Sequence, residues 1–450
     1  MQHQFAIAGL ILLAASCSAA PRPGELQARA RAGAAPRGAT AAPEFPAAAV
    51  QDPAALLRLG AARNPGLQAA HSRWVAALER VPQAGSLPDP RLTFTGYLAE
   101  VETRVGPMQG RVGVSQAIPW FGKLDAAADA AAALAEAEHE ALEAAQWDLR
   151  ARVLAAWSEY AWLVQAVAIA EGHMELLTYL ESVSQSRYAT GSTSHADVVR
   201  VQIEIGTTEN RLRSLKDLRA PLVARLNAAL DRPAAAELDW PESQQPAALP
   251  GALESGAGLG DTHPVLRALR RRIEAAGHRL ASAEKERYPD FQVGADWTLI
   301  GPARMPGVAG SGEDAFGLTL GVELPIRSGR IQAGIAEARA ETAAARAELA
   351  EQSNRLAAEL AMALYESRDA ERRIALYRDG LIPKSEEALQ ATLGAYSTGE
   401  AGFDALIDAT RLQIEFQLAA ARAEADLVQS LAAAERLSGV VRLDIARNES

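Results

Sequence analysis

The sequence predicts a mainly α-helical protein with a small β part, built from two copies of one structural unit. Three observations support this prediction. Short motifs recur about 200 residues apart, residues 124–187 form a 64-residue stretch without proline, and four segments alternate apolar with polar residues. Hydrophobic residues make up 49% of the 450-residue chain but aromatic residues only 5%, so the core is built mainly from alanine and aliphatic side chains.

Charge and residue usage exclude several classes of function. The chain has 45 basic and 56 acidic residues and a formal net charge of −11, which repels phosphate backbones and argues against nucleic acid as a partner. A single cysteine excludes disulfide frameworks and thiolate metal clusters. The seven histidines are scattered, with no pair at i, i+4 spacing. We therefore predict no metal site, no cofactor and no catalytic residues, and we do not expect an enzyme.

The N-terminus predicts export. Residues 5–15 form an apolar run of 11 residues, typical of a secretory signal and too short to span ~30 Å of hydrocarbon. The following Ala14-Ala15-Ser16-Cys17 resembles a lipoprotein cleavage site. We expect a lipoprotein-type signal peptide over residues 1–16 and lipidation at Cys17. Because Ala14 stands where leucine is usual and the first four residues lack lysine and arginine, a plain signal peptide with a chance cysteine stays as the alternative.

Residues 17–50 are rich in alanine, proline, arginine and glycine, with few large apolar residues. Such a segment buries too little apolar surface to offset the entropy of ordering, so a flexible tether is predicted there. No later stretch contains 18 consecutive apolar residues, so no transmembrane helix is predicted.

An internal repeat organises the rest of the chain. The string NPGL at 64–67 recurs as HPVL at 263–266, and RYATG at 187–191 recurs as AYSTG at 395–399. The offset grows from 199 to 208 residues between these motifs, which places the insertions in loops. We therefore predict a first repeat over 51–245 and a second over 246–442.

Each copy is predicted to begin with a helix that enters two strands. The helices, 53–78 and 264–286, each open on a proline, which is tolerated at the first helical position. The strand segments follow with a period of two; they are 92–98, 112–114, 291–299 and 316–324. Strands of this kind suit a tilted membrane span with a wet interior, and a half-buried soluble hairpin is the alternative.

Four strands are too few to close a membrane barrel, which needs roughly eight. An oligomer must supply the remainder, and three chains of four strands give twelve. A self-sufficient porin is therefore disfavoured by strand count.

Two long helices are expected to dominate the mass. Residues 124–187 give about 96 Å of helix at 1.5 Å per residue, and 331–393 is the second-copy counterpart. Alanine-rich apolar stripes predict coiled-coil packing against the return helices, 197–230 and 404–438. Gly380 and Pro383 interrupt the second long helix, so a bend or register change is expected there.

Four segments resemble one known family. They are SLPDPRLTFTG, GVSQAIPWFGKL, RYATGSTSHADVV and AYSTGEAGFDALIDA. Together they resemble the TolC-like outer membrane factors, the exit ducts of tripartite efflux and type I secretion machines. The similarity covers about residues 51–440, and the PDP and IPWFGKL strings look most like the heavy-metal members that serve resistance-nodulation-division (RND) pumps.

The resemblance implies a homotrimer in the bacterial outer membrane. Twelve strands would form one barrel in the lipid, and twelve helical columns a tunnel in the periplasm. A periplasmic adaptor protein and an inner-membrane RND pump would be the partners. A periplasmic coiled-coil scaffold lipoprotein stays as one alternative. A multidrug or type I secretion duct is another, because the pump rather than the duct usually selects the substrate.

The resemblance also assigns gate residues. It implies that Tyr396 in the second tip turn bonds Asp197 after the first tip turn and so holds the tunnel closed. It places Asp408, with Asp404 one turn earlier, at the constriction, where a trimer would present a ring of carboxylates that favours cations. A solvated helix face is the simpler explanation of both carboxylates. Some members carry an arginine where this chain has Ala401, so a second lock is not expected.

The two tip turns, around Gly191 and Gly399, are implied to dock the adaptor. Ordinary turn chemistry also explains a glycine at each position, because a left-handed residue is commonly needed between helices. At the other end, loops 102–108 and 301–313 are expected to be extracellular, the second of them glycine-rich and mobile.

Overall fold

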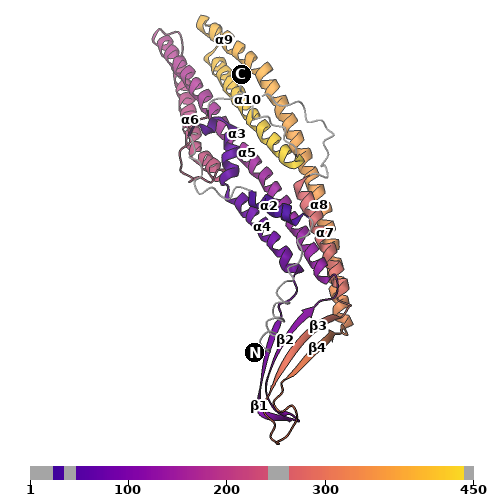
Figure 1. Ribbon diagram of the computed structural model, residues 1–450. Helices are drawn as coiled ribbons and strands as arrows, with labels where there is room; N and C mark the ends of the chain where they lie inside the picture. The colour runs from indigo at the N-terminus through magenta and orange to yellow at the C-terminus, as the bar shows by residue number, and fades with distance from the viewer. Residues whose placement is uncertain (1–23, 35–46, 242–262, 440–450) are drawn as a thin grey trace. The chain divides into compact units, whose positions relative to one another are not determined.

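The computed structural model describes residues 24–34, 47–241 and 263–439, which are drawn as ribbons in Figure 1. Contacts between residues divide the chain into two compact units. The predicted signal peptide and Cys17 lie outside the described residues. The element order of the two copies agrees with the predicted repeat. A short helical segment leads into two strands, then a long helix and a return helix, twice in succession.

The first unit contains the sheet and the helical segments next to it. Its elements are α2 (Glu25–Ala34), most of α4 (Pro65–Gly85), β1 (Arg91–Thr103), β2 (Gly106–Ile118), the start of α5 (Lys123–Ala189), most of α7 (Pro264–Lys285), β3 (Asp290–Ile300), β4 (Ala315–Glu323) and the start of α8 (Ser328–Ala375). The four strands pair antiparallel in the order β1-β2-β3-β4.

The register of the sheet separates its two faces. One row of directly paired residues is apolar on all four strands: Phe94, Val112, Trp297 and Phe316. An adjacent row on the opposite face is Thr93, Gly113, Asp296 and Gly317. The apolar side chains are exposed in the single chain, 71% for Phe94 and 90% for Leu318. The prediction of period-two strands is therefore confirmed, and the exposed apolar face requires a partner other than water.

The polar face is held by its own contacts. Arg111 on β2 forms a 2.6 Å ion pair with Asp296 on β3, and the Gln292 side-chain amide donates to the Ser115 hydroxyl at 3.2 Å. Threonines, glycines and these charged groups line a shallow cavity of about 250 Å³ on this face. The alternation therefore leaves one wet and one apolar surface, as a membrane barrel requires.

The loop over residues 301–314, which the sequence predicts to be mobile, makes several contacts with the β1–β2 turn. The backbone N–H groups of Gly301 and Gly312 donate at 2.8 Å to the carbonyls of Pro107 and Val105 in the β1–β2 turn. Arg304 also forms ion pairs with Glu100 and Glu102. Sequence composition signalled a glycine-rich loop but not these contacts with a turn almost 200 positions earlier.

The second unit is helical. It contains η1 (Ala47–Gln51), α3 (Pro53–Arg63), the remainder of α5, α6 (His195–Ala229), the remainder of α8, the π-helical segment η2 (Leu376–Leu381), α9 (Ile382–Thr398) and α10 (Phe403–Ser438). Its largest apolar cluster packs Leu56, Val153, Tyr160, Leu163 and Leu226, all buried. Trp157 adds a hydrogen bond from its indole N–H to the Val50 carbonyl at 2.9 Å.

The long helices behave as predicted in one copy and differ in the other. Helix α5 runs unbroken for 67 residues. In the second copy, α8 ends at Ala375, a π-helical turn follows, and α9 starts with Pro383 in its first turn. The predicted irregularity near Gly380 and Pro383 is confirmed. A π-helical turn accommodates proline because it relaxes the ladder that the ring would interrupt.

Two expectations near the N-terminus are corrected. The segment predicted as a flexible tether contains α2 and η1, and Ala28 and Ala32 of α2 are buried. Arg29 fixes α2 through ion pairs to Glu25 and to Glu79 of α4. The single helix predicted over 53–78 is instead two helices that meet at Asn64, because the residue before a proline disfavours helical geometry.

Asn64 and His263 make equivalent contacts in the two copies. The Asn64 side-chain amide donates to the Ala229 carbonyl at 3.3 Å, at the end of α6. His263 contacts the Arg436 carbonyl at 3.1 Å, near the end of α10. Each side chain also accepts from a backbone N–H in the following helix, that of Leu67 or Val265. The repeat thus conserves a helix junction while changing the residue that makes it.

Candidate functional site

The helical tip of the second unit contains most of the residues expected to gate or dock. A small apolar cluster holds the tip together; its buried members include Leu177, Leu180, Val201, Leu389, Tyr396, Phe403 and Leu406. These residues come from α5, α6, α9 and α10. Both copies therefore contribute to one tip core, on which the turns and the polar side chains are mounted.

The two tip turns share one geometry. Gly191 has φ +74° and Gly399 has φ +83°, in the left-handed region that favours glycine. The residue after each glycine donates a backbone hydrogen bond of 2.8 Å to a carbonyl five residues earlier. The Ser192 N–H donates to the Arg187 carbonyl, and the Glu400 N–H donates to the Ala395 carbonyl. This is the pattern of a Schellman helix end. A side-chain carbon added at either glycine would meet nothing within 4 Å, so backbone conformation alone explains the glycines.

Tyr396 is buried under an arginine that the sequence prediction did not include. Its residue exposure is 4%, and its hydroxyl has no hydrogen-bond partner among the described residues. The Arg187 guanidinium lies 4.7 Å from the Tyr396 ring centre and donates to the Tyr396 carbonyl at 2.7 Å. Phe403 packs edge-on against the same ring at 5.5 Å. Tyr396 is therefore fixed by its ring and backbone rather than by its hydroxyl.

Asp197 caps its own helix. Its carboxylate accepts from the Thr193 hydroxyl at 2.6 Å and from the Ser194 backbone N–H at 3.1 Å, the reach-back half of a capping box. Burial raises the pKa of Asp197, but these hydrogen bonds outweigh it, and the net pKa lies below the usual range. The structure does not join Asp197 to Tyr396 within this chain, so the expected lock is not formed among the described residues.

Asp404 and Asp408 lie one turn apart on the exposed face of α10, with 67% and 71% of their side chains exposed. Asp404 pairs with Arg200 of α6, and Asp408 lies 3.7 Å from Arg411. Arg411 also pairs with the largely buried Glu204. Phe403, Leu406 and Ile407 occupy the buried face of the same turns. Each carboxylate thus has a cationic neighbour, which reduces the charge that a ring of aspartates would present.

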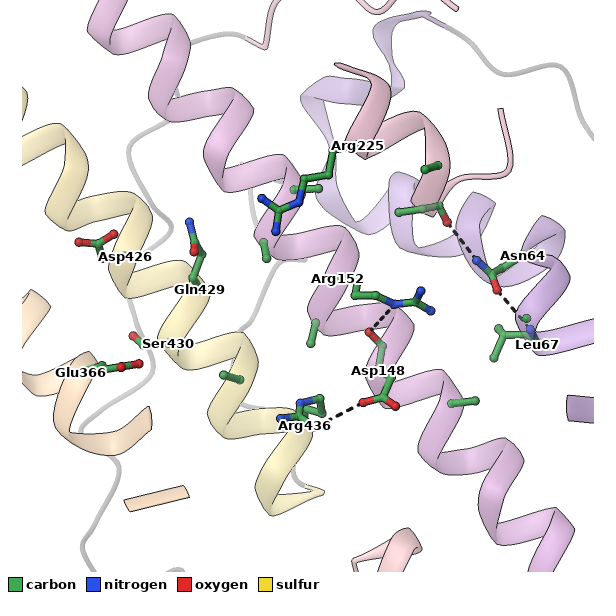
Figure 2. Close-up of a pocket in the computed structure, with 18 of the residues that line it drawn as sticks. Asn64, Leu67, Asp148, Arg152, Arg225, Glu366, Asp426, Gln429, Ser430 and Arg436 are labelled. Carbon is green, nitrogen blue, oxygen red and sulfur yellow. Dashed lines mark hydrogen bonds and ion pairs between the residues drawn. The ribbon is translucent and has the colours of Figure 1, made fainter. Parts of the chain in front are cut away.

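A cavity of about 1250 Å³ lies in the same unit and was not foreseen from sequence. Figure 2 shows its labelled polar side chains coming from separate helices. Four carboxylates and four arginines line it: Asp148, Glu366, Asp369, Asp426, Arg152, Arg225, Arg373 and Arg436. Arg373 pairs with Asp426 at 3.0 Å and Arg436 with Asp148 at 3.5 Å. Because charges of the two signs balance, the cavity favours neither anions nor cations.

A sheet with one exposed apolar face, joined to very long helices, is the fold of a membrane channel protein. The chain belongs to the outer membrane efflux protein family, whose model matches residues 56–232 and 261–440. Members of this family are transport ducts, in agreement with the expectation that the chain is not an enzyme. The protein lies in the outer membrane, with its helical part in the periplasm.

Solved structures show the same fold at low sequence identity. The outer membrane protein VceC from Vibrio cholerae is 20% identical, with a TM-score of 0.72 over 87% of this chain and 97% of that one. CusC is 16% identical, with a TM-score of 0.74 over 86% and 92%. The MtrE outer membrane channel of Neisseria gonorrhoeae is 18% identical, with a TM-score of 0.70 over 86% and 89%. No curated protein sequence matches the chain.

Among the described residues, α5 alone is long and apolar enough to cross a membrane by length and composition, and half of its most apolar window is buried within the chain. That burial, together with the alanine content, is what a packing helix shows.

Proposed function

We propose that three copies of this chain form the exit duct of a tripartite RND-type efflux system. The duct would conduct substrates passively from the pump and adaptor to the exterior. The observation that carries the proposal is the open four-stranded sheet. Its β1 and β4 edges have no strand partner among the described residues, and its apolar face is exposed. Three such sheets supply twelve strands, enough for a barrel. A periplasmic scaffold has no use for this face.

The trimer is tested on protein extracted from outer-membrane fractions. We expect a detergent-solubilised particle that contains three chains and dissociates only on heating, and step-like conductance when it is added to planar bilayers. A monomeric particle without conductance would overturn the proposal. Matched samples extracted from the inner membrane control for mislocalised protein.

The adaptor and the anchor belong to the same proposal. The exposed tip turns around Gly191 and Gly399 would meet the periplasmic adaptor, and Cys17 would carry acyl chains, of which two or more anchor stably. Metabolic labelling with a radioactive fatty acid should label the parent protein and should not label the Cys17→Ser variant. Site-specific cross-linkers at Ser192 and Glu400 should capture an adaptor, whereas the same linker at Arg346, on another exposed helix face, should not.

Heavy-metal cations are the substrates we infer. The PDP and IPWFGKL strings resemble the metal-exporting members, and Asp404 and Asp408 supply exposed carboxylates on the tip helix. Multidrug export or type I secretion is the alternative. A deletion strain challenged with divalent and monovalent metals, hydrophobic drugs and dyes distinguishes them. Selective sensitivity to metals supports the inference, and sensitivity to drugs alone contradicts it.

A further inference from the structure

The end of the sheet that joins the helices carries a patch of aromatic and basic residues. We call residues 120–123, 285–290 and 324–330 the collar. They follow β2, precede β3 and follow β4, so they lie at one end of the sheet. Because the helical part is periplasmic, this end meets the inner leaflet of the outer membrane.

Aromatic contacts place Trp120 and Tyr288 of the collar beside the apolar face of the sheet. Trp120 stacks on Tyr288 with ring centres 5.0 Å apart and planes 9° apart. Trp120 also stacks on Phe291 at 5.9 Å. Phe291 pairs with Val322 on the apolar face. The exposed side chains of Phe121 and Ile326, 74% and 83%, extend this surface past the last strand pairs. Such amphipathic rings are typical of the membrane interface.

The two acidic residues of the collar form ion pairs with basic residues of the collar. The Lys123 ammonium is buried and pairs with Asp290 at 2.9 Å and Glu286 at 3.4 Å. Asp290 also accepts from the Trp120 backbone N–H at 2.7 Å. Arg330 reaches Glu286 at 3.6 Å. Both carboxylates are therefore neutralised by cations within the collar.

Two arginines of the collar have no acidic partner among the described residues. Arg287 and Arg327 are exposed and make no ion pair with any described residue. The Lys285 ammonium lies beside the Gly122 backbone, where an added Cβ would come within 2.6 Å of it. The collar thus has five cations, Lys123, Lys285, Arg287, Arg327 and Arg330, against two carboxylates. The flanking Asp89, Arg91 and Glu323, at the same end of the sheet, change this to six cations against four carboxylates, still a positive excess in a chain whose net charge is −11. A local excess of positive charge in an acidic protein indicates an anionic partner.

We propose that the collar binds the headgroups of anionic glycerophospholipids in the inner leaflet. Charge complementarity and continuity with the lipid-facing sheet select this occupant over a soluble anion. Arg287 and Arg327 would contact the phosphate and glycerol groups while Trp120, Phe121 and Tyr288 lie at the headgroup level. The proposal rests on the outer-membrane location and does not depend on the trimeric duct or its substrate.

The test measures lipid retention by the purified full-length protein. Native mass spectrometry compares phosphatidylglycerol with phosphatidylethanolamine of identical acyl chains. Since one basic residue near an anionic surface strengthens binding by about fivefold, Arg287→Gln with Arg327→Gln should reduce the preference for phosphatidylglycerol by on the order of twentyfold. These substitutions leave the Lys123–Asp290 network in place, so folding is expected to survive.

Arg213→Gln with Arg346→Gln is the matched control, because both arginines are exposed and form no ion pair with described residues. The control should keep the parent's preference. The proposal is overturned if the parent shows no preference for the anionic lipid, if both double variants lose it equally, or if the collar variant loses binding of lipid A, the anionic lipid of the outer leaflet, and not of phosphatidylglycerol.

Discussion

Arg187 covers the ring of Tyr396 from 209 positions away in the sequence, with its guanidinium 4.7 Å from the ring centre. It donates to the carbonyls of both Tyr396 and Ser397, at 2.7 and 3.0 Å. Arg187 therefore adds a polar link between α5 and the C-terminal end of α9 to the apolar cluster that already joins them. Separation of α9 from α5 at the tip would have to break that contact.

Replacing Arg187 with alanine should loosen the end of α9. The change removes a cation–π contact and two charge-assisted hydrogen bonds, so we expect local opening to become easier by about 2 kcal/mol, roughly 30-fold in exchange rate. Amide hydrogen exchange over residues 389–400 reports this. Arg213→Ala, on an exposed face of α6, is the control. Equal protection in Arg187→Ala and the parent would show that the apolar cluster alone holds the tip.

Tyr396→Phe distinguishes a hydrogen bond that closes the channel from a role of Tyr396 in packing alone. Because the hydroxyl is buried and has no partner in the chain, removing it should change the free energy of unfolding by less than about 0.5 kcal/mol or even stabilise the fold. If the assembled channel closes through a Tyr396–Asp197 bond, the same substitution should raise single-channel conductance. A double-mutant cycle with Asp197→Ala is the measurement, since Asp197 also caps a helix. Additive effects of the two substitutions on conductance contradict the lock.

Asp197 should make tip stability depend on pH. Its pKa is lowered in the folded chain from an ordinary value of 3.8, so its stabilising effect is fully present above that value. The effect is lost as the pH falls through the lower, folded-state pKa. Asp197→Asn should remove this dependence and lower the free energy of unfolding near neutral pH, because a neutral amide oxygen accepts these hydrogen bonds more weakly than a carboxylate does. Protease sensitivity of the 190–195 turn between pH 7 and pH 3 tests it, with Asp217→Asn as the control. Parallel profiles for Asp197→Asn and the parent would argue against the cap.

Asp404 and Asp408 should set ion selectivity if three copies surround one axis. Asp408→Asn is expected to weaken cation selectivity and block by trivalent cations, because it removes an exposed carboxylate of the tip helix. Asp404→Asn should act less, since Asp404 is paired with Arg200. Reversal potentials in asymmetric salt are the measurement. Unchanged selectivity in the Asp408 variant would place the constriction elsewhere.

The sequence predicted what is local and missed what joins distant segments. Strand faces were predictable because alternation is a property of neighbouring residues, and the irregularity at Pro383 follows from the residue itself. The contacts Arg187–Tyr396 and Asn64–Ala229 bring together positions more than 160 apart, which no local pattern indicates. The helix cap at Asp197 has a local signal, the capping-box spacing of Ser194-His195-Ala196-Asp197, whereas the family resemblance implies a lock at the same residue.

The helix α2 was missed for a related reason. Residues 25–34 contain little apolar surface, so composition favoured a tether. The structure stabilises them through a single arginine that bridges to Glu79, and through the Ala32 carbonyl, which His71 contacts at 3.0 Å. Because alanine side chains are small, a helix that packs on its neighbour through alanines gives only a weak hydrophobic pattern in the sequence.

Adjacent residues of β4 provide the sharpest test of the membrane-facing sheet. Leu318 lies on the apolar face and is 90% exposed, whereas Thr319 lines the cavity on the polar face. Leu318→Lys places a charge in lipid and should destabilise the membrane-inserted protein by about 2–4 kcal/mol near the bilayer midplane. We therefore expect loss of heat-modifiable oligomers from the outer membrane. Thr319→Lys should insert normally and shift selectivity toward anions, because its charge faces water. Equal insertion of both variants would mean that the apolar face packs against protein rather than lipid.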